Sequence, residues 1–289
     1  MLVRIISSIV LFPVLFGLVY YGGLPLKIGT IFVSIIGMYE FYKAIYKKIM
    51  PIHYLGFIFA LIYLLLLNVI NIELEALVLS GFLLVSLIFM VFNHKSISIF
   101  DISLTFFSVF YIPVMFSGIY LITNLQDGKY TVWLPFICAW ACDTGAYFTG
   151  ITLGKHKLTP ELSPKKTIEG AIGGILFSAV FCGIYGIYVG NKDIHIFENS
   201  VSTIICFILI GIIGSIFAQF GDLTASATKR RFNIKDYGNL IPGHGGILDR
   251  FDSVIFTAGI CYIILKILEY LTYNDIVTNL EIVMLYSRF

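Results

Sequence analysis

Long apolar runs, separated by short polar segments, make up most of this 289-residue chain. About 20 apolar residues are enough to cross a bilayer as a helix, so each run is a candidate membrane span. The polar segments are too short to form a separate soluble domain. The pattern predicts an all-α, polytopic helical bundle with nine transmembrane helices, at 4–21, 27–45, 52–71, 74–92, 104–124, 131–151, 168–189, 202–221 and 252–272.

Composition and charge support this interpretation and suggest an orientation. The chain is 58% hydrophobic and 12% charged, whereas soluble domains contain about 25% charged residues. With the N-terminus in the cytoplasm, fourteen of the 19 Lys and Arg residues fall in inner segments, and the outer segments hold Lys27, Lys129, Lys192 and Arg288. Because basic residues are retained on the cytoplasmic side, we expect an inner-membrane protein whose polar segment 222–252 faces the cytoplasm.

The two parts of the chain differ in chemistry, although we expect one integral domain. Residues 1–125 have no acidic residue at a span centre apart from Glu40, which we place near the cytoplasmic end of its helix. We expect this part to be scaffold, lipid-facing wall or oligomer interface. Residues 126–289 are expected to form the catalytic region, with cytoplasmic active-site loops.

An ionisable residue, Asp143, lies about halfway along the predicted span 131–151. An isolated carboxylate at that depth has to be paired, protonated or metal-bound. Since such residues usually mark functional sites in membrane proteins, we favour a functional role for Asp143 over structural pairing.

The polar segment 154–167 follows this span and contains four lysines and a histidine. It leads into a helix that we expect to begin at Thr167. Helix N-termini bind anions, so Ser163, Lys165, Lys166 and Thr167 are candidates for holding phosphates. An equally weighted alternative is that these lysines only set the topology.

The segment 222–252 concentrates charge at the end of the eighth predicted span. If that helix continues beyond the membrane, Asp222, Ser226, Lys229 and Arg230 share one face. Such a face offers a carboxylate for a metal ion and cationic donors for phosphate oxygens. The alternative is a polar helix end at the membrane interface.

The same segment closes with a glycine-rich turn and an acidic pair. The backbone of Pro242–Gly246 can bring N–H groups close to a ligand. His244, within it, is a phosphate donor, a general acid or a loop hydrogen-bonder. Asp249 and Asp252 are three residues apart and adjacent on the next helix. Together with the other carboxylates they indicate a hard-cation site, and oxygen ligands favour Mg²⁺ over zinc.

These residues together resemble the signature of the CDP-diacylglycerol synthases (phosphatidate cytidylyltransferases). The fixed positions of that signature are met by Ser226, Lys229, Arg230, Lys235, Asp236, Gly238, His244, Gly245, Gly246, Asp249, Arg250 and Asp252. Thr228 stands where an aliphatic residue is usual, but it is β-branched and close to Val in size. The resemblance is specific over 140–253, and the first half of the chain is similar only in hydropathy.

The resemblance implies transfer of CMP from CTP to phosphatidic acid, which yields CDP-diacylglycerol and pyrophosphate. It further implies dependence on Mg²⁺, a potassium ion beside the magnesium, membrane lipids as surroundings and a homodimer. We expect no nucleic-acid partner.

Roles for individual residues are hypotheses on this basis. Asp222 and Asp249 are expected to hold the metal, with Asp252 and Asp143 supporting or completing its shell. Lys229 and Arg230 are expected to contact the triphosphate or the leaving pyrophosphate. The residues expected to bind or orient phosphates are Ser226, Lys235, His244, Arg250, Lys165 and Lys166.

Two other functions are compatible with parts of this sequence. Another CTP-dependent lipid enzyme, such as a polyprenol kinase or an ether-lipid cytidylyltransferase, would share the logic of polar loops at a membrane surface. An ion transporter would use Asp143 to line an ion path. The transporter hypothesis does not explain the clustered Lys, Arg and His-Gly-Gly residues.

Overall fold

The structure, a computed structural model, describes residues 2–45, 52–69, 72–192, 200–243 and 245–286. Most of these residues are helical, and the helices follow the apolar runs. They are α1 (Leu2–Tyr21), α2 (Gly23–Ile45), α3 (His53–Leu66), α4 (Ile72–Phe92), α5 (Ile99–Val109), α6 (Gly118–Ile122), α7 (Gly128–Thr131), α8 (Leu134–Thr152), α9 (Ile168–Gly190), α10 (Ser200–Arg231) and α11 (Leu248–Tyr286). A short π-helix, Phe110–Val114, continues α5.

Six described helical segments are long and apolar enough to cross a membrane, in keeping with a multi-pass membrane protein. They are Gly23–Ile45, Glu73–Phe92, Ile99–Ile122, Ile168–Gly190, Ser200–Arg231 and Leu248–Thr272. The predicted spans 4–21, 52–71 and 131–151 contain helices that fall outside this set. With 14 residues, α3 is about 21 Å long, shorter than a hydrocarbon core of about 30 Å. The described residues therefore do not confirm nine spans, and the orientation stays a prediction.

A two-stranded hairpin interrupts the helical pattern where the sequence indicated only a polar loop. Strand β1 (Lys157–Thr159) pairs antiparallel with β2 (Ser163–Thr167), with Lys157 opposite Thr167 and Thr159 opposite Ser163. Helix α9 then begins at Ile168, one residue after the expected start. Its N-cap is Thr167, whose hydroxyl accepts a hydrogen bond from the Gly170 N–H at 3.1 Å. That hydroxyl caps a helix, as Ser and Thr side chains commonly do.

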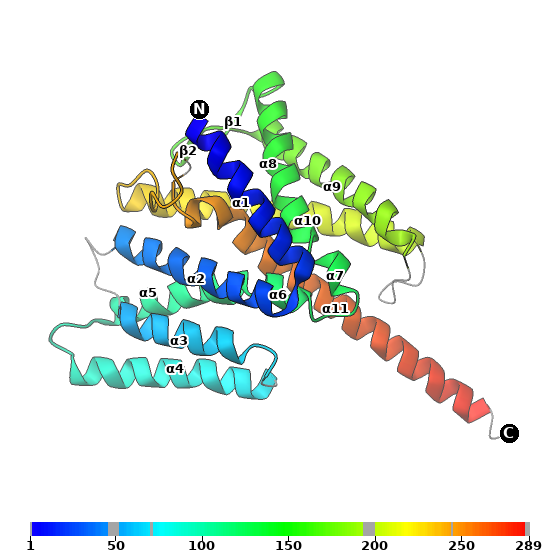
Figure 1. Cartoon of the computed structure of the whole chain (residues 1–289), viewed down its shortest axis with the longest axis horizontal. Coiled ribbons are helices and arrows are strands. Elements are labelled where there is room, and N and C mark those ends of the chain that lie inside the picture. Colours follow the sequence, from blue (N-terminus) through cyan, green and yellow to red (C-terminus); the bar gives the residue numbers. More distant parts are fainter. Residues whose placement is uncertain (1, 46–51, 70–71, 193–199, 244, 287–289) are drawn as a thin grey trace.

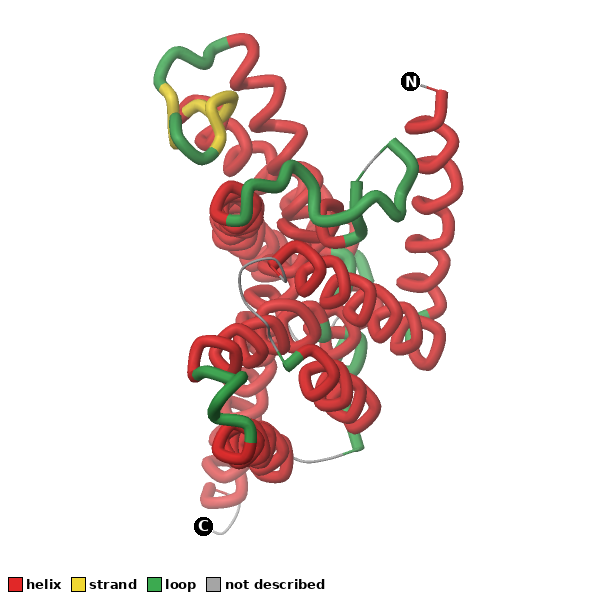
Figure 2. The backbone as a smooth tube through the Cα atoms, turned by 90° about the vertical axis from the view of Figure 1, so that its left-hand side faces the viewer, coloured by secondary structure: helices red, strands yellow, loops and turns green. Residues whose placement is uncertain are grey.

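The helices lie mostly side by side, as Figure 1 shows for α2, α3, α4 and α5, while α1 and α8 run at a steep angle to them. In Figure 2, turned by 90°, several helices are seen end-on and the hairpin lies at one edge of the molecule. Many large apolar side chains on α1, α4 and α9 are exposed. This is the surface expected of helices that face lipid tails.

Glycines allow α8 and α9 to pack closely. A Cβ atom at Gly174 would lie 2.9 Å from the Cys142 carbonyl oxygen, and one at Gly170 would lie 2.9 Å from the Ala146 carbonyl oxygen. The spacing of these two glycines is typical of close helix contacts in membranes. The contact positions α8, which carries Asp143, against α9.

Candidate active site

Helix α10 carries the predicted polar face. It continues without interruption to Arg231, so Asp222, Ser226 and Lys229 lie on consecutive turns of one helix, as expected. The Ser226 hydroxyl lies 3.4 Å from Asp222 Oδ1. Arg230 is exposed and directs its Nε toward the Leu162 carbonyl oxygen in the hairpin, 3.5 Å away.

Asp249 holds the segment between α10 and α11 in place. Its Oδ1 is 2.9 Å from Lys229 Nζ, and its Oδ2 accepts hydrogen bonds from the Tyr237 N–H at 2.8 Å and the Gly246 N–H at 3.0 Å. The Asp249 side chain is only 2% exposed. Because a buried carboxylate needs such partners, Asp249 joins the end of α10, the loop and the start of α11 into one unit.

The glycine-rich turn contains two backbone conformations that favour glycine. Gly243 and Gly245 have φ angles of 77° and 85°, which glycine adopts without the penalty that a Cβ imposes. An isolated antiparallel bridge joins Ile241 and Gly245 across the turn. His244, expected to orient phosphates, lies outside the described residues.

A second lysine–carboxylate pair links the hairpin to α10. Lys166 Nζ lies 2.5 Å from Asp222 Oδ2, and the two side chains are 25% and 33% exposed. Both residues were predicted to belong to the site, but their pairing was not predicted. Lys166 lies in β2, and the hairpin brings its side chain to Asp222 on α10.

Three carboxylates from three helices lie near enough to one another to interact electrostatically. Asp222 interacts with Asp143 and with Asp252, and Asp143 also interacts with Asp252. Lys166 and Arg250 oppose the charge of Asp143. The structure therefore gathers the four predicted acidic residues, Asp249 included, with cations between them.

Other predicted residues are exposed around this cluster. Lys165 and Lys235 both lie on the surface, and within the described part of the chain their side chains have no hydrogen bond or ion pair. Their positions suit residues that meet a ligand arriving from solution. Arg250 is also exposed, at the first turn of α11.

The contact that Glu40 of α2 makes with the signature segment was not predicted from the sequence. This side chain is buried, and its carboxylate accepts hydrogen bonds from the backbone N–H groups of Ile247 at 3.1 Å and Leu248 at 2.9 Å. An acidic residue in an apolar helix needs a polar partner. That need was the available signal, although the sequence alone does not say where the partner lies.

Tyr237 was also missed. Its ring lies 5.4 Å from Lys229 Nζ, within cation–π distance. Burial raises the pKa of the Tyr237 phenol well above its usual range, and the charges of Asp252 and Asp249 act in the same direction. The phenol therefore stays neutral and adds no further negative charge to the site.

The residues present fit a divalent metal that is shared with a ligand. Asp222 and Asp249 are the two carboxylates assigned to the metal. Each of them contacts a lysine ammonium, which supplies positive charge beside the carboxylate. Among the described residues, no group of three or more His, Cys, Asp or Glu side chains is arranged to hold a metal by itself. Mg²⁺ commonly uses one or two carboxylates together with substrate phosphates, which matches this donor set.

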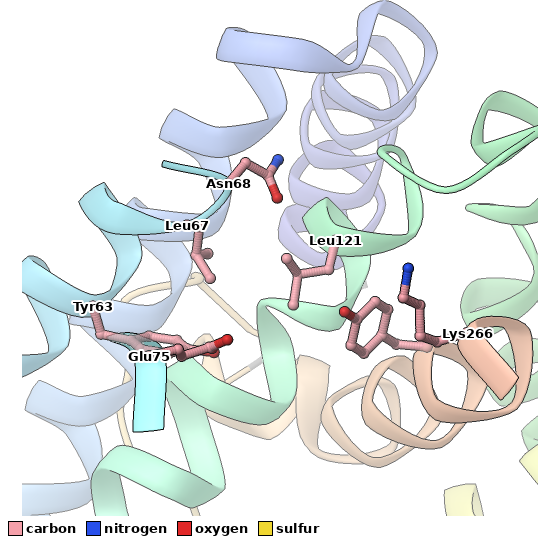
Figure 3. Close-up of a pocket in the computed structure, with 7 residues that line it drawn as sticks. Tyr63, Leu67, Asn68, Glu75, Leu121 and Lys266 are labelled. Atoms are coloured by element: carbon pink, nitrogen blue, oxygen red, sulfur yellow. The ribbon is translucent and has the colours of Figure 1, made fainter. Parts of the chain in front are cut away.

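A cavity of about 200 Å³ lies away from this cluster, between α3, α4, α6 and α11. It is lined by Tyr63, Leu67, Asn68, Glu75, Leu121, Tyr262 and Lys266 (Figure 3). Lys266 is 17 residues beyond Asp249 on α11, which corresponds to about 25 Å along a helix. The cavity is therefore separate from the charged cluster.

Comparison with known protein families matches residues 2–268 to the cytidylyltransferase family. The chain belongs to that family. The match extends beyond the signature segment and takes in the N-terminal helices, where sequence motifs were not informative. Membership in the cytidylyltransferase family thus applies to both parts of the chain, and it agrees with the resemblance drawn from the signature residues.

Three relatives of this chain are each named phosphatidate cytidylyltransferase. The chain is 34% identical over 271 residues to the phosphatidate cytidylyltransferase of Staphylococcus haemolyticus, covering 92% of this chain and 99% of the relative. It is 35% identical over 271 residues to that of Staphylococcus saprophyticus, covering 91% and 97%. The Staphylococcus aureus protein of the same name is 34% identical over 272 residues, covering 92% and 99%.

Proposed function

We propose that this protein is a phosphatidate cytidylyltransferase, which transfers CMP from CTP to phosphatidic acid and releases pyrophosphate. Family membership and the name of its relatives support this activity. The structural observation that carries the proposal is the pair of lysine–carboxylate contacts, Lys166 with Asp222 and Lys229 with Asp249, at one end of an apolar bundle. Cations and carboxylates at such a place suit a reaction between a soluble and a membrane-bound polyanion.

The chemistry requires positioning more than proton transfer. An oxygen of the lipid phosphate attacks the α-phosphorus of CTP, a new P–O bond forms, and the bond to the β-phosphate oxygen breaks. The attacking oxygen already carries negative charge, so a strong general base is not needed. The main task is to cancel the repulsion between two polyanions and hold them in line.

The two lysine–carboxylate pairs suggest how the site prepares for its ligands. In the arrangement described, each ammonium neutralises a carboxylate that is assigned to the metal. We propose that Lys166 and Lys229 turn toward phosphate oxygens when the substrates bind, which frees oxygens of Asp222 and Asp249. Bound Mg²⁺ would then supply charge neutralisation at the phosphates.

The surrounding residues complete the proposed site. Asp143 and Asp252 would support the metal shell and, as the resemblance implies, a potassium ion beside it. Residues proposed to hold or orient phosphates are Arg230, Ser226, Lys235, His244, Arg250 and Lys165. We further propose a homodimer in the inner membrane, with this site facing the cytoplasm.

The function is tested by incubating the purified protein with radiolabelled CTP and phosphatidic acid in detergent. We expect labelled CDP-diacylglycerol only when Mg²⁺ is present, and loss of the product when the metal is removed with EDTA. Restoring Mg²⁺ should restore the rate. A folded protein that makes no product from these substrates contradicts the proposal, and product from a polyprenol or an ether-lipid acceptor alone would redirect it.

A further inference from the structure

Glu40 reaches from α2 into the segment that carries the signature residues, although more than 200 positions separate them in the sequence. Its two carboxylate oxygens are divided between two consecutive amides: Oε1 accepts from Ile247 N–H and Oε2 from Leu248 N–H. These amides lie at the start of α11, where backbone N–H groups have no partner within the helix. Glu40 therefore caps α11 from another helix.

Two glycines of the signature make room for this carboxylate. A Cβ atom would lie 2.7 Å from Glu40 Cδ if built on Gly238, and 2.6 Å from it if built on Gly246. Neither glycine has a positive φ angle, in contrast to Gly243 and Gly245. Their lack of a side chain is thus explained by the space that Glu40 occupies, and not by backbone conformation.

The amides held by Glu40 continue directly from the one held by Asp249. The Gly246 N–H donates to Asp249, and the next two N–H groups donate to Glu40. A shift of this turn would move Asp249. It would also disturb the Lys229 ammonium, which lies 2.9 Å from Asp249 Oδ1. The position of the site is in this way tied to α2.

We propose that Glu40 is a positioning residue of the reaction, which fixes the turn before α11 and through it the Asp249–Lys229 pair. It does not touch the substrates. The proposal rests on the proposed function. It gives the N-terminal part of the chain, expected from sequence to be scaffold or interface, a direct part in setting the geometry of the site.

The test compares Glu40→Gln and Glu40→Ala with the matched control Tyr42→Phe. Tyr42 is also buried in α2, but its hydroxyl pairs with Ser108 Oγ at 2.6 Å, in α5. Loss of positioning can lower a rate by about 100-fold. Within that range we expect kcat to fall about 10-fold in Glu40→Gln, which keeps one acceptor, and about 30-fold in Glu40→Ala. KM for CTP should change less, and Tyr42→Phe should retain the wild-type kcat.

Amide hydrogen exchange gives a second readout that does not depend on activity. Residues 245–248 should exchange faster in both Glu40 variants than in the wild-type protein, and at the wild-type rate in Tyr42→Phe. If exchange in this turn and kcat per folded molecule both match the control, Glu40 is not a positioning residue. An inactive wild-type protein would instead contradict the proposed function, while the exchange result would still decide whether Glu40 fixes this turn.

A double variant separates the steric effect from general damage. Gly238→Ala should reduce kcat in the wild-type background, because the new methyl group displaces the Glu40 carboxylate. In the Glu40→Ala background, Gly238→Ala should lower kcat by less than about 3-fold. The effects of substitutions at two residues in contact do not add independently. Full additivity of the two changes would overturn the proposed contact.

Discussion

Asp249→Asn is expected to lower the rate of CDP-diacylglycerol formation by about 1,000-fold, comparable to the loss of a charge-stabilising group at other active sites. The carboxylate accepts from two backbone N–H groups and from Lys229. An amide at this position would direct its NH₂ group toward one of these donors and would remove the charge that pairs with the lysine. Initial rates at saturating CTP and phosphatidic acid measure the effect.

The matched control for this variant is Asp101→Asn. Asp101 is also buried at the start of a helix, where it forms a capping box with Ser98 at the N-terminus of α5. Its loss should reduce stability by about 1 kcal/mol and leave turnover unchanged. Near-normal activity of Asp249→Asn would refute the role of Asp249 in the site.

Asp222→Asn is the second change with a large expected effect, again about 1,000-fold in rate. Asp222 is 33% exposed and has a lysine partner, so the fold should tolerate the amide better than at a buried position. The variant should also need more Mg²⁺ for half-maximal rate, because a proposed ligand is lost. Measuring the rate as a function of Mg²⁺ concentration distinguishes this from simple destabilisation.

Glu161→Gln provides the comparison for Asp222→Asn. Glu161 is exposed in the hairpin, close in sequence to Lys166 but outside the carboxylate cluster. Glu161→Gln removes one negative charge, as Asp222→Asn does. It should alter neither the rate nor the Mg²⁺ requirement. If the two variants have the same Mg²⁺ dependence, Asp222 is not a metal ligand.

Local patterns predicted most of the helices and one face of the site. The apolar runs located the helical segments, and the 3.6-residue period placed Asp222, Ser226 and Lys229 together on α10. Helix α9 begins where a Thr and the following apolar run indicated. These features depend on neighbouring residues, so a single sequence is sufficient for them.

Contacts between distant segments could not be predicted in the same way. The pairing of Lys166 with Asp222 depends on a hairpin whose two short strands have little alternation of apolar and polar residues. Glu40 reaches its partners through packing between α2 and the start of α11. Periodicity identifies the face of a helix but does not identify the element packed against it. The number of spans stays a prediction, because apolar character alone does not show whether a helix crosses the membrane.

The length of α10 bears on how the protein meets a lipid. Its 32 residues correspond to about 48 Å, some 18 Å more than a typical hydrocarbon core. If the apolar end of α10 spans that core, the ten residues from Asp222 to Arg231 extend to the depth of the lipid headgroups. A phosphatidic acid molecule could then bring its phosphate to the cluster by lateral diffusion while its tails stay among other tails. If the cluster contacts only the phosphate of the lipid, recognition does not depend on tail length or unsaturation, and we expect similar rates with different acyl chains.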